Sequence, residues 1–159
     1  MQNPKDEVRV LLTDLCTAPN AKALEGIFQK YYTPDARLLN PVCQAGTRKG
    51  IQNIFELYRI MSPNTEARTK SVMYDESTKV VMLEAEHNFH LWFSPFPKKP
   101  ARVNVRLSLK EINGRLFIYQ QEDLYHWVDV AAMILPPLAP IVGIMLALSG
   151  WMMGIMAMI

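Results

Sequence analysis

The stretch Val80-Val-Met-Leu-Glu-Ala-Glu-His-Asn-Phe-His-Leu-Trp-Phe93 alternates between two kinds of side chain along its length. One set of alternate positions is apolar except for a single histidine: Val81, Leu83, Ala85, His87, Phe89, Leu91 and Phe93. The other set is mostly polar and includes Glu84, Glu86, Asn88 and His90. Because successive side chains of a β-strand point to opposite faces, the pattern predicts a long strand with one face on a core and the other in water.

Further extended segments surround this strand in the sequence. We expect a short one over Ala36–Asn40 and longer ones over Arg68–Tyr74, Arg102–Lys110 and Arg115–His126. The last two are separated by Asn113-Gly114, a strong signal for a tight hairpin turn. The later part of the domain is therefore expected to be an antiparallel sheet.

Helical spacing of apolar residues precedes the strands. It predicts helices over Asp6–Cys16, from a cap at Asn20 to about Tyr32, and over Arg48–Met61. Three helices followed by hairpin-linked strands indicate an α+β fold, with the helices on one face of a curved antiparallel sheet.

The C-terminal segment has a different composition. Asp129 is the last charged residue, and Val130–Ile159 contains no Lys, Arg, Asp, Glu or His. As a helix, Ile141–Ile159 would be about 28 Å long, close to the hydrocarbon thickness of a bilayer. We expect residues 1–128 to form the folded domain and residues 129–159 a hydrophobic tail that anchors it to a membrane. Spanning and interfacial arrangements remain open, as does a tail that caps a pocket or packs in a dimer.

Composition excludes several classes of protein. Half of the 159 residues are apolar and the formal net charge is +2, which excludes a disordered chain and a polycation that coats nucleic acid. Two cysteines cannot form a disulfide framework, and the N-terminus lacks the apolar core of a signal peptide. We therefore expect the folded domain to lie in the cytosol. No spacing of His and Cys indicates a metal site, and no cofactor is expected.

Three segments carry a family resemblance: Phe28–Pro41, Thr47–Tyr58 and Gly114–Tyr125. Together with the order of elements, they resemble the nuclear-transport-factor-two-like superfamily, which includes SnoaL-like polyketide cyclases, ketosteroid isomerases and limonene epoxide hydrolases. The resemblance implies a cone, formed by a curved sheet wrapped around helices, with an apolar pocket inside. Such a fold hosts enzymes, ligand binders and transport adaptors, so it does not decide function.

Three ionisable residues are candidates for catalysis. His87 is the one ionisable side chain in the apolar set of the long strand, although a hydrogen-bonded core histidine would fit equally. Asp35 lies at the exit of the second helix, a segment from which relatives in this superfamily draw polar residues of the pocket, and it could act as a general base or form an Asx turn. The related cyclases often place a His-x-Asp pair where this chain has Gln121 and Asp123, so Asp123 is the third candidate. It could also lie on an open sheet face, where these folds often form homodimers.

Aromatic residues complete the candidate site. We expect Tyr31, Tyr32, Tyr58, Phe89 and Tyr119 to bind substrate, with the tyrosine hydroxyls as hydrogen-bond donors. The resulting hypothesis is a membrane-associated, cofactor-independent cyclase or isomerase acting on a lipophilic polyketide or terpenoid. The alternative is a non-catalytic module that binds a lipid or a protein at a membrane.

Overall fold

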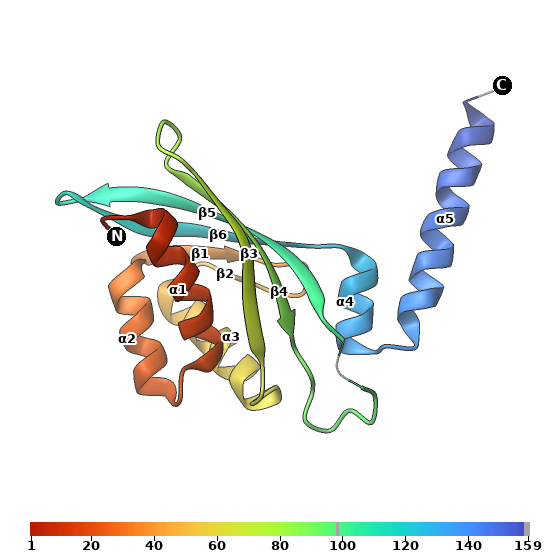
Figure 1. The fold of residues 1–159 in the computed structure, drawn as a ribbon, viewed down its shortest axis with the longest axis horizontal. Helices are drawn as coiled ribbons and strands as arrows, with labels where there is room; N and C mark the ends of the chain where they lie inside the picture. The colour runs from red at the N-terminus through yellow and green to blue at the C-terminus, as the bar shows by residue number, and fades with distance from the viewer. Residues whose placement is uncertain (98, 158–159) are drawn as a thin grey trace.

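The computed structural model describes residues 1–97 and 99–157 (Figure 1). Its helices are α1 (Pro4–Thr17), α2 (Ala21–Tyr31), α3 (Arg48–Met61), α4 (Trp127–Ile134) and α5 (Leu138–Met156). Its strands are β1 (Tyr32–Leu39), β2 (Gln44–Ala45), β3 (Glu66–Asp75), β4 (Val80–Asn88), β5 (Ala101–Ile112) and β6 (Arg115–Tyr125). The α+β fold class predicted from the sequence is confirmed.

A single curved sheet contains the six strands in the order β2-β1-β6-β5-β4-β3. The ladders from β3 to β6 are antiparallel, as expected, and Asn113 and Gly114 both adopt positive φ in the β5–β6 turn. One pairing differs from the prediction, because β1 lies parallel to β6 and makes the sheet mixed. Long stretches of chain separate β1 from β6, so no short turn requires them to be antiparallel.

Strand β4 ends at Asn88, five residues before the predicted end at Phe93. The strands beside it do not extend further, because β3 begins opposite Asn88 and β5 begins opposite His87. Residues after Asn88 therefore have no strand to pair with among the described residues. The residues that follow bond to the end of α3 instead: the backbone N–H of Trp92 donates to the carbonyl of Met61 at 2.9 Å. Phe89–Phe93 therefore belongs to a loop at the end of α3.

Strand β6 contains a β-bulge. Ser108 of β5 is opposite Gln120 and Leu109 is opposite Ile118, so Tyr119 is an extra residue in β6. A bulge interrupts strict alternation, and here Ile118 and Gln121 are both buried. The bulge explains why neither set of alternate positions in this strand is uniformly apolar.

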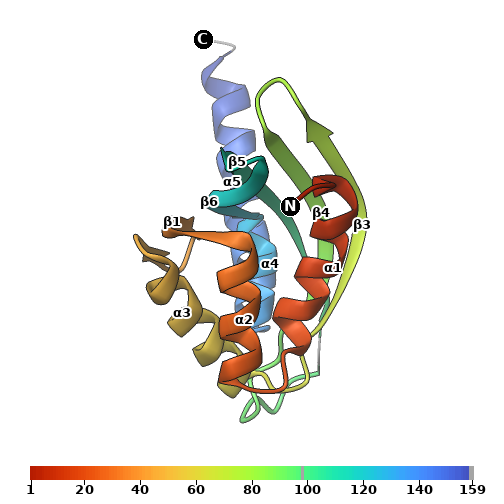
Figure 2. The ribbon, with the colours of Figure 1, turned by 90° about the vertical axis from the view of Figure 1, so that its left-hand side faces the viewer.

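The helices α1, α2 and α3 cover the concave face of the sheet (Figure 2). Leu24, Phe28 and Ile51 are fully buried against sheet residues such as Val81 and Ala85. Side-chain caps fix the starts of two helices: the Asn20 side chain accepts from the N–H of Ala23, as predicted, and Thr47 accepts from the N–H of Gly50.

The C-terminal tail forms two helices joined at Pro136-Pro137. The short α4 packs against β5 and buries Val130. The longer α5 projects from the body of the protein (Figure 1), and only 6% of its most apolar window is buried. It begins at Leu138, three residues earlier than predicted, and Met158 and Ile159 lie outside the described residues. By length and composition α5 could cross a membrane.

Candidate functional site

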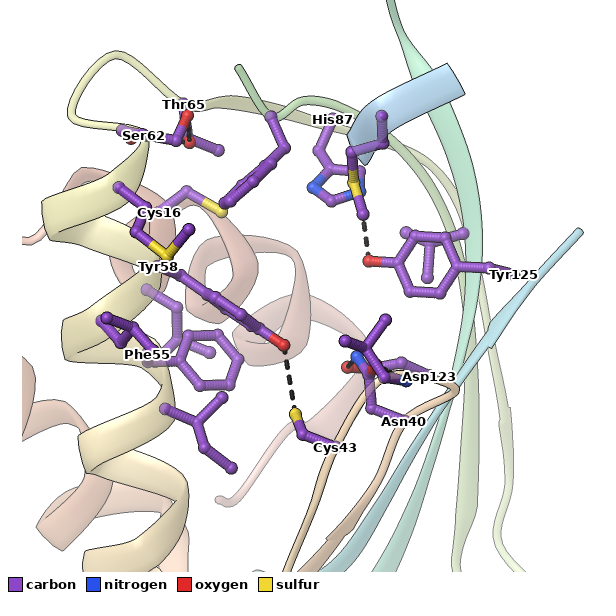
Figure 3. A pocket seen from close by; sticks show the side chains of 18 of the residues that line it. Cys16, Asn40, Cys43, Phe55, Tyr58, Ser62, Thr65, His87, Asp123 and Tyr125 are labelled. Atoms are coloured by element: carbon purple, nitrogen blue, oxygen red, sulfur yellow. Dashed lines mark hydrogen bonds between the residues drawn. The ribbon is translucent and has the colours of Figure 1, made fainter. Parts of the chain in front are cut away.

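A cavity of about 410 Å³ lies between α1, α3, α4 and the concave face of the sheet (Figure 3). Most of its lining is apolar, with contributions such as Leu12 and Leu15 from α1, Ile54 and Phe55 from α3, Val103 and Val105 from β5, and Met133 from α4. A few polar side chains interrupt this surface. An apolar cavity with few polar groups is typical of small-molecule sites.

The carboxyl group of Asp123 is buried in the cavity wall. The amide nitrogen of Gln121 donates to its Oδ1 at 2.8 Å, and the amide nitrogen of Asn40 donates to its Oδ2 at 3.1 Å. Behind them, the buried hydroxyl of Tyr32 donates to Oε1 of Gln121. Burial raises the pKa of Asp123, although the two amide hydrogen bonds oppose this rise. The carboxyl group is thus fixed in place and is a stronger base than an exposed aspartate.

A second polar pair lies nearby in the cavity (Figure 3), where the hydroxyl of Tyr125 is 3.1 Å from Nε2 of His87. Burial lowers the pKa of His87 to about 4, so its imidazole is neutral at pH 7. In the tautomer that carries the proton on Nδ1, Nε2 accepts the hydrogen bond from Tyr125. Burial also raises the pKa of Tyr125 well above its usual value. Both groups are therefore uncharged near neutral pH.

Two cysteines reach the cavity from different elements. Cys16 comes from α1, and burial raises the pKa of its thiol to about 11, which keeps it protonated. Cys43 lies between β1 and β2, with its Sγ 3.2 Å from the hydroxyl of Tyr58. The pKa of Tyr58 is raised, chiefly by burial and then by its contact with Cys43. These groups add hydrogen-bonding atoms to the wall.

Four of the residues predicted for the site line the cavity: His87, Asp123, Tyr58 and Phe89. The other four do not: Asp35, Tyr31, Tyr32 and Tyr119. Of the three ionisable candidates, His87 on β4 and Asp123 on β6 line the cavity, whereas Asp35 on β1 does not.

Asp35 is exposed on β1, whereas its neighbour Ala36 is buried. The side chains of adjacent strand residues point to opposite faces, so a buried Ala36 directs Asp35 outward. A role for Asp35 as a general base inside the cavity does not agree with this position. Tyr31 is buried outside the cavity, with the ammonium group of Lys30 over its ring.

Tyr32 and Tyr119 are displaced from the cavity for different reasons. Tyr32 supports the site from behind, through its hydrogen bond to Gln121. Tyr119 is the bulge residue and is 41% exposed.

Sequence reasoning missed several residues of the wall. Tyr125 lies two residues after Asp123, on the same face of a regular strand, and this spacing is the signal that could have identified it. Asn40 precedes a proline in the sequence, and nothing local indicates that its amide reaches a carboxylate on β6. Val130, Met133 and Ile134 of α4 also line the cavity, so the start of the tail covers the pocket while α5 does not.

Within residues 1–97 and 99–157, no three His, Cys, Asp or Glu side chains lie close enough together to hold a metal ion.

The curved sheet, the helices on its concave face and the apolar cavity between them define a nuclear-transport-factor-two-like fold. Within this class the chain belongs to the family of SigF NTF2-like domains, whose sequence model matches residues 1–159. No curated protein sequence matches it.

Solved structures confirm the fold at low sequence identity. A Catenulispora acidiphila protein with a ketosteroid isomerase-like fold, in complex with trimethylamine, is 17% identical, with a TM-score of 0.61 over 81% of this chain and 92% of that one. A candidate SnoaL-like isomerase from Agrobacterium tumefaciens is 13% identical, with a TM-score of 0.60 over 77% and 97%. A candidate scytalone dehydratase from Novosphingobium aromaticivorans is 10% identical, with a TM-score of 0.60 over 75% and 81%. The fold is compatible with an isomerase or cyclase and also occurs in proteins that are not enzymes.

Proposed function

We propose that the protein is a cofactor-independent isomerase or cyclase that acts on a lipophilic small molecule of polyketide or terpenoid type at a membrane. The observation that carries this proposal is the buried carboxyl group of Asp123 in the wall of an apolar cavity. Its raised pKa suits proton transfer near neutral pH better than that of an exposed aspartate would.

The proposed reaction is a proton transfer at a carbon next to a carbonyl group. Asp123 takes the proton from this carbon and returns it to another atom of the same molecule, so no proton is gained or lost overall. Tyr125 is two residues further along the same face of β6, about 7 Å away along the strand. When His87 carries its proton on Nε2, that nitrogen donates to the hydroxyl oxygen of Tyr125. The hydrogen of Tyr125 can then be donated to the substrate oxygen on which negative charge develops. The apolar walls restrict the conformations of the substrate.

The tail supports the location of this reaction. Residues 130–159 carry no charge, and α5 is long and apolar enough to enter a bilayer. We propose that it holds the folded domain on the cytosolic side of a membrane, where lipophilic compounds accumulate. The fold shared with the candidate SnoaL-like isomerase and the candidate scytalone dehydratase is consistent with chemistry on such compounds.

Deuterium exchange tests the proposal directly. The full chain in detergent micelles is incubated in D₂O with a panel of polyketide and terpenoid ketones, and exchange at carbon is followed by mass spectrometry. We expect Asp123→Asn to lower the exchange rate by about 100-fold or more, since general-base catalysis contributes that much. Asp35→Asn is the matched control, because Asp35 is exposed outside the cavity, and its rate should stay within twofold of the wild type, roughly.

Two results would contradict the catalytic role. One is exchange that persists in Asp123→Asn at the wild-type rate. The other is a wild-type protein that catalyses no exchange while a lipid copurifies in its cavity, which would favour the non-catalytic binding module.

A further inference from the structure

The cavity opens to solvent at a definite place. Three residues that line it are also largely exposed: Val42 (58%), Leu57 (52%) and Ile134 (46%). A side chain that faces both the cavity and solvent marks the opening between them. The mouth therefore lies between the segment joining β1 to β2, helix α3 and helix α4.

Exposed apolar side chains extend from this mouth. Ile60 is on α3, one turn beyond Leu57, and is 57% exposed. Trp92 (69% exposed) and Phe93 (59% exposed) lie in the loop after β4, with ring centroids 5.4 Å apart. That loop is fixed to α3 by the hydrogen bond from Trp92 to Met61. We call the set Val42, Leu57, Ile60, Trp92, Phe93 and Ile134 the apolar rim.

The apolar rim lies at the same end of the molecule as the start of α5. Figures 1 and 2 place the C-terminal end of α3, the loop after β4 and the turn between α4 and α5 at the same end of the molecule. Helix α4 is fixed there by buried Val130 and by an ion pair between Arg102 and Asp129 at 3.4 Å. The rim is thus held next to the first residues of α5.

The chemistry of this surface matches a lipid bilayer. Helix α5 exposes apolar side chains in every turn and has no charged residue, so a bilayer is the environment that it fits. Tryptophan is enriched at the boundary between lipid and water, and both Trp92 in the rim and Trp127 at the start of α4 are exposed. Isolated exposed apolar residues are ordinary in proteins, whereas a contiguous patch indicates a binding surface.

We infer that the apolar rim contacts the lipid bilayer, so that the mouth of the cavity opens onto the membrane and receives its ligand from the hydrocarbon region. This inference rests on the membrane attachment proposed above. It goes beyond that attachment because α5 alone could anchor the domain with its cavity turned toward water. Contact of the rim with lipid fixes the orientation of the domain, with the mouth of the cavity facing the membrane.

Tryptophan fluorescence in full-length chains tests this orientation. Each of three variants keeps a single tryptophan, with the remaining native tryptophans replaced by Phe: one keeps Trp92, one keeps Trp151, and one carries Met73→Trp. All three native tryptophans are at least 60% exposed, so their replacement should not affect folding. Met73, on β3, is 65% exposed and belongs to the hairpin at the opposite end of the molecule (Figure 1). It is the matched control for Trp92.

The variants are reconstituted in vesicles of phosphatidylcholine with and without bromine on the acyl chains. We expect bromine to lower the fluorescence of Trp92 and Trp151 by about twofold and to leave the Met73→Trp variant almost unchanged. Quenching of Trp151 without quenching of Trp92 would overturn the rim inference and leave the anchor intact. If neither is quenched, both the anchor and the rim contact are wrong. Quenching of the Met73→Trp variant as strong as that of Trp92 would also overturn the assigned orientation.

Discussion

The cavity wall and helix α5 are both built largely from apolar residues, but they differ in the polar groups that they contain. On β6, Gln121, Asp123 and Tyr125 place polar atoms in an apolar surface, and each is hydrogen-bonded. Helix α5 has no charged side chain, and its apolar surface is uncovered. The few polar groups of the wall are positioned by partners, which suits the proposed action on a ligand. Helix α5 carries no charge, and its Ser149 hydroxyl donates to the carbonyl of Leu146 within the helix, which suits contact with lipid.

The largest expected effect comes from giving α5 the charge that it lacks. Ile144 and Leu148 are four residues apart and both are largely exposed, so Ile144→Lys with Leu148→Lys places two charges on one face. Each lysine near the centre of a membrane helix costs about 2.5 to 3.5 kcal/mol, so binding to vesicles should fall by roughly 1,000-fold or more. Flotation with phosphatidylcholine vesicles measures this loss.

Met73→Lys is the control for that experiment, since it adds a charge to an exposed site on the folded domain. It should leave flotation unchanged, and the double variant should keep the unfolding midpoint of the wild-type domain. If the double variant floats as well as the wild type does, α5 is not the membrane anchor.

An effect of intermediate size is expected on the pH dependence of the free energy of unfolding, because His87 is buried. The pKa of His87 is about 4 in the folded protein, below its usual value of 6.5. Between these values the unfolded chain takes up a proton that folded His87 does not, so stability falls as pH decreases from 6.5 toward 4. Because a difference of one in pKa corresponds to about 1.4 kcal/mol, His87 should contribute a loss of about 2 to 3 kcal/mol.

Urea unfolding of the wild type and His87→Gln at pH 7 and pH 4.5 measures this contribution. The raised pKa of Asp123 acts in the opposite direction, because a carboxyl group that binds its proton more tightly when folded favours the folded state as pH falls. Both proteins contain Asp123, so the difference between them isolates the histidine. Equal losses of stability on acidification would show that His87 is not buried as a neutral base.

A smaller effect is expected when one partner of the carboxyl group is removed. Asn40→Ala takes away the amide that donates to Oδ2 of Asp123. An unsatisfied buried acceptor costs about 1 to 3 kcal/mol, so the free energy of unfolding at pH 7 should fall by that amount. Asn104→Ala, at an exposed position on β5, is the control and should change stability by about 0.5 kcal/mol or less. Equal effects of the two substitutions would mean that the hydrogen bond from Asn40 to Asp123 does not contribute to stability.

The fold was predictable because its signals are local and repeated. The alternation around Val81 and Ala85, the cap at Asn20 and the Asn113-Gly114 turn each depend on a few neighbouring residues, and each is confirmed. The end of β4 was not predictable in this way. It depends on where β3 and β5 begin, whereas the alternating pattern itself continues to Phe93.

The candidate site was predicted only in part, because its geometry depends on contacts between distant segments. His87 stood out as the one ionisable residue in an apolar register, and it does line the cavity. Asp35 was placed by analogy with relatives, but the alternation of β1 turns it outward. The contact from Asn40 to Asp123 joins residues that are 83 positions apart, and no local pattern encodes it.

The β-bulge at Tyr119 determines which of two adjacent acidic residues becomes the buried one. In a regular strand of the same sequence, Ile118 would share its face with Gln120, Glu122 and Leu124. Glu122 would then enter the apolar cavity, and Asp123 would face the charged outer side of the sheet. With the extra residue, Oε2 of Glu122 lies 3.5 Å from Nη1 of Arg106, and Asp123 lines the cavity. The basicity available to a ligand is therefore set by the hydrogen-bond register of the backbone as much as by the choice of side chain.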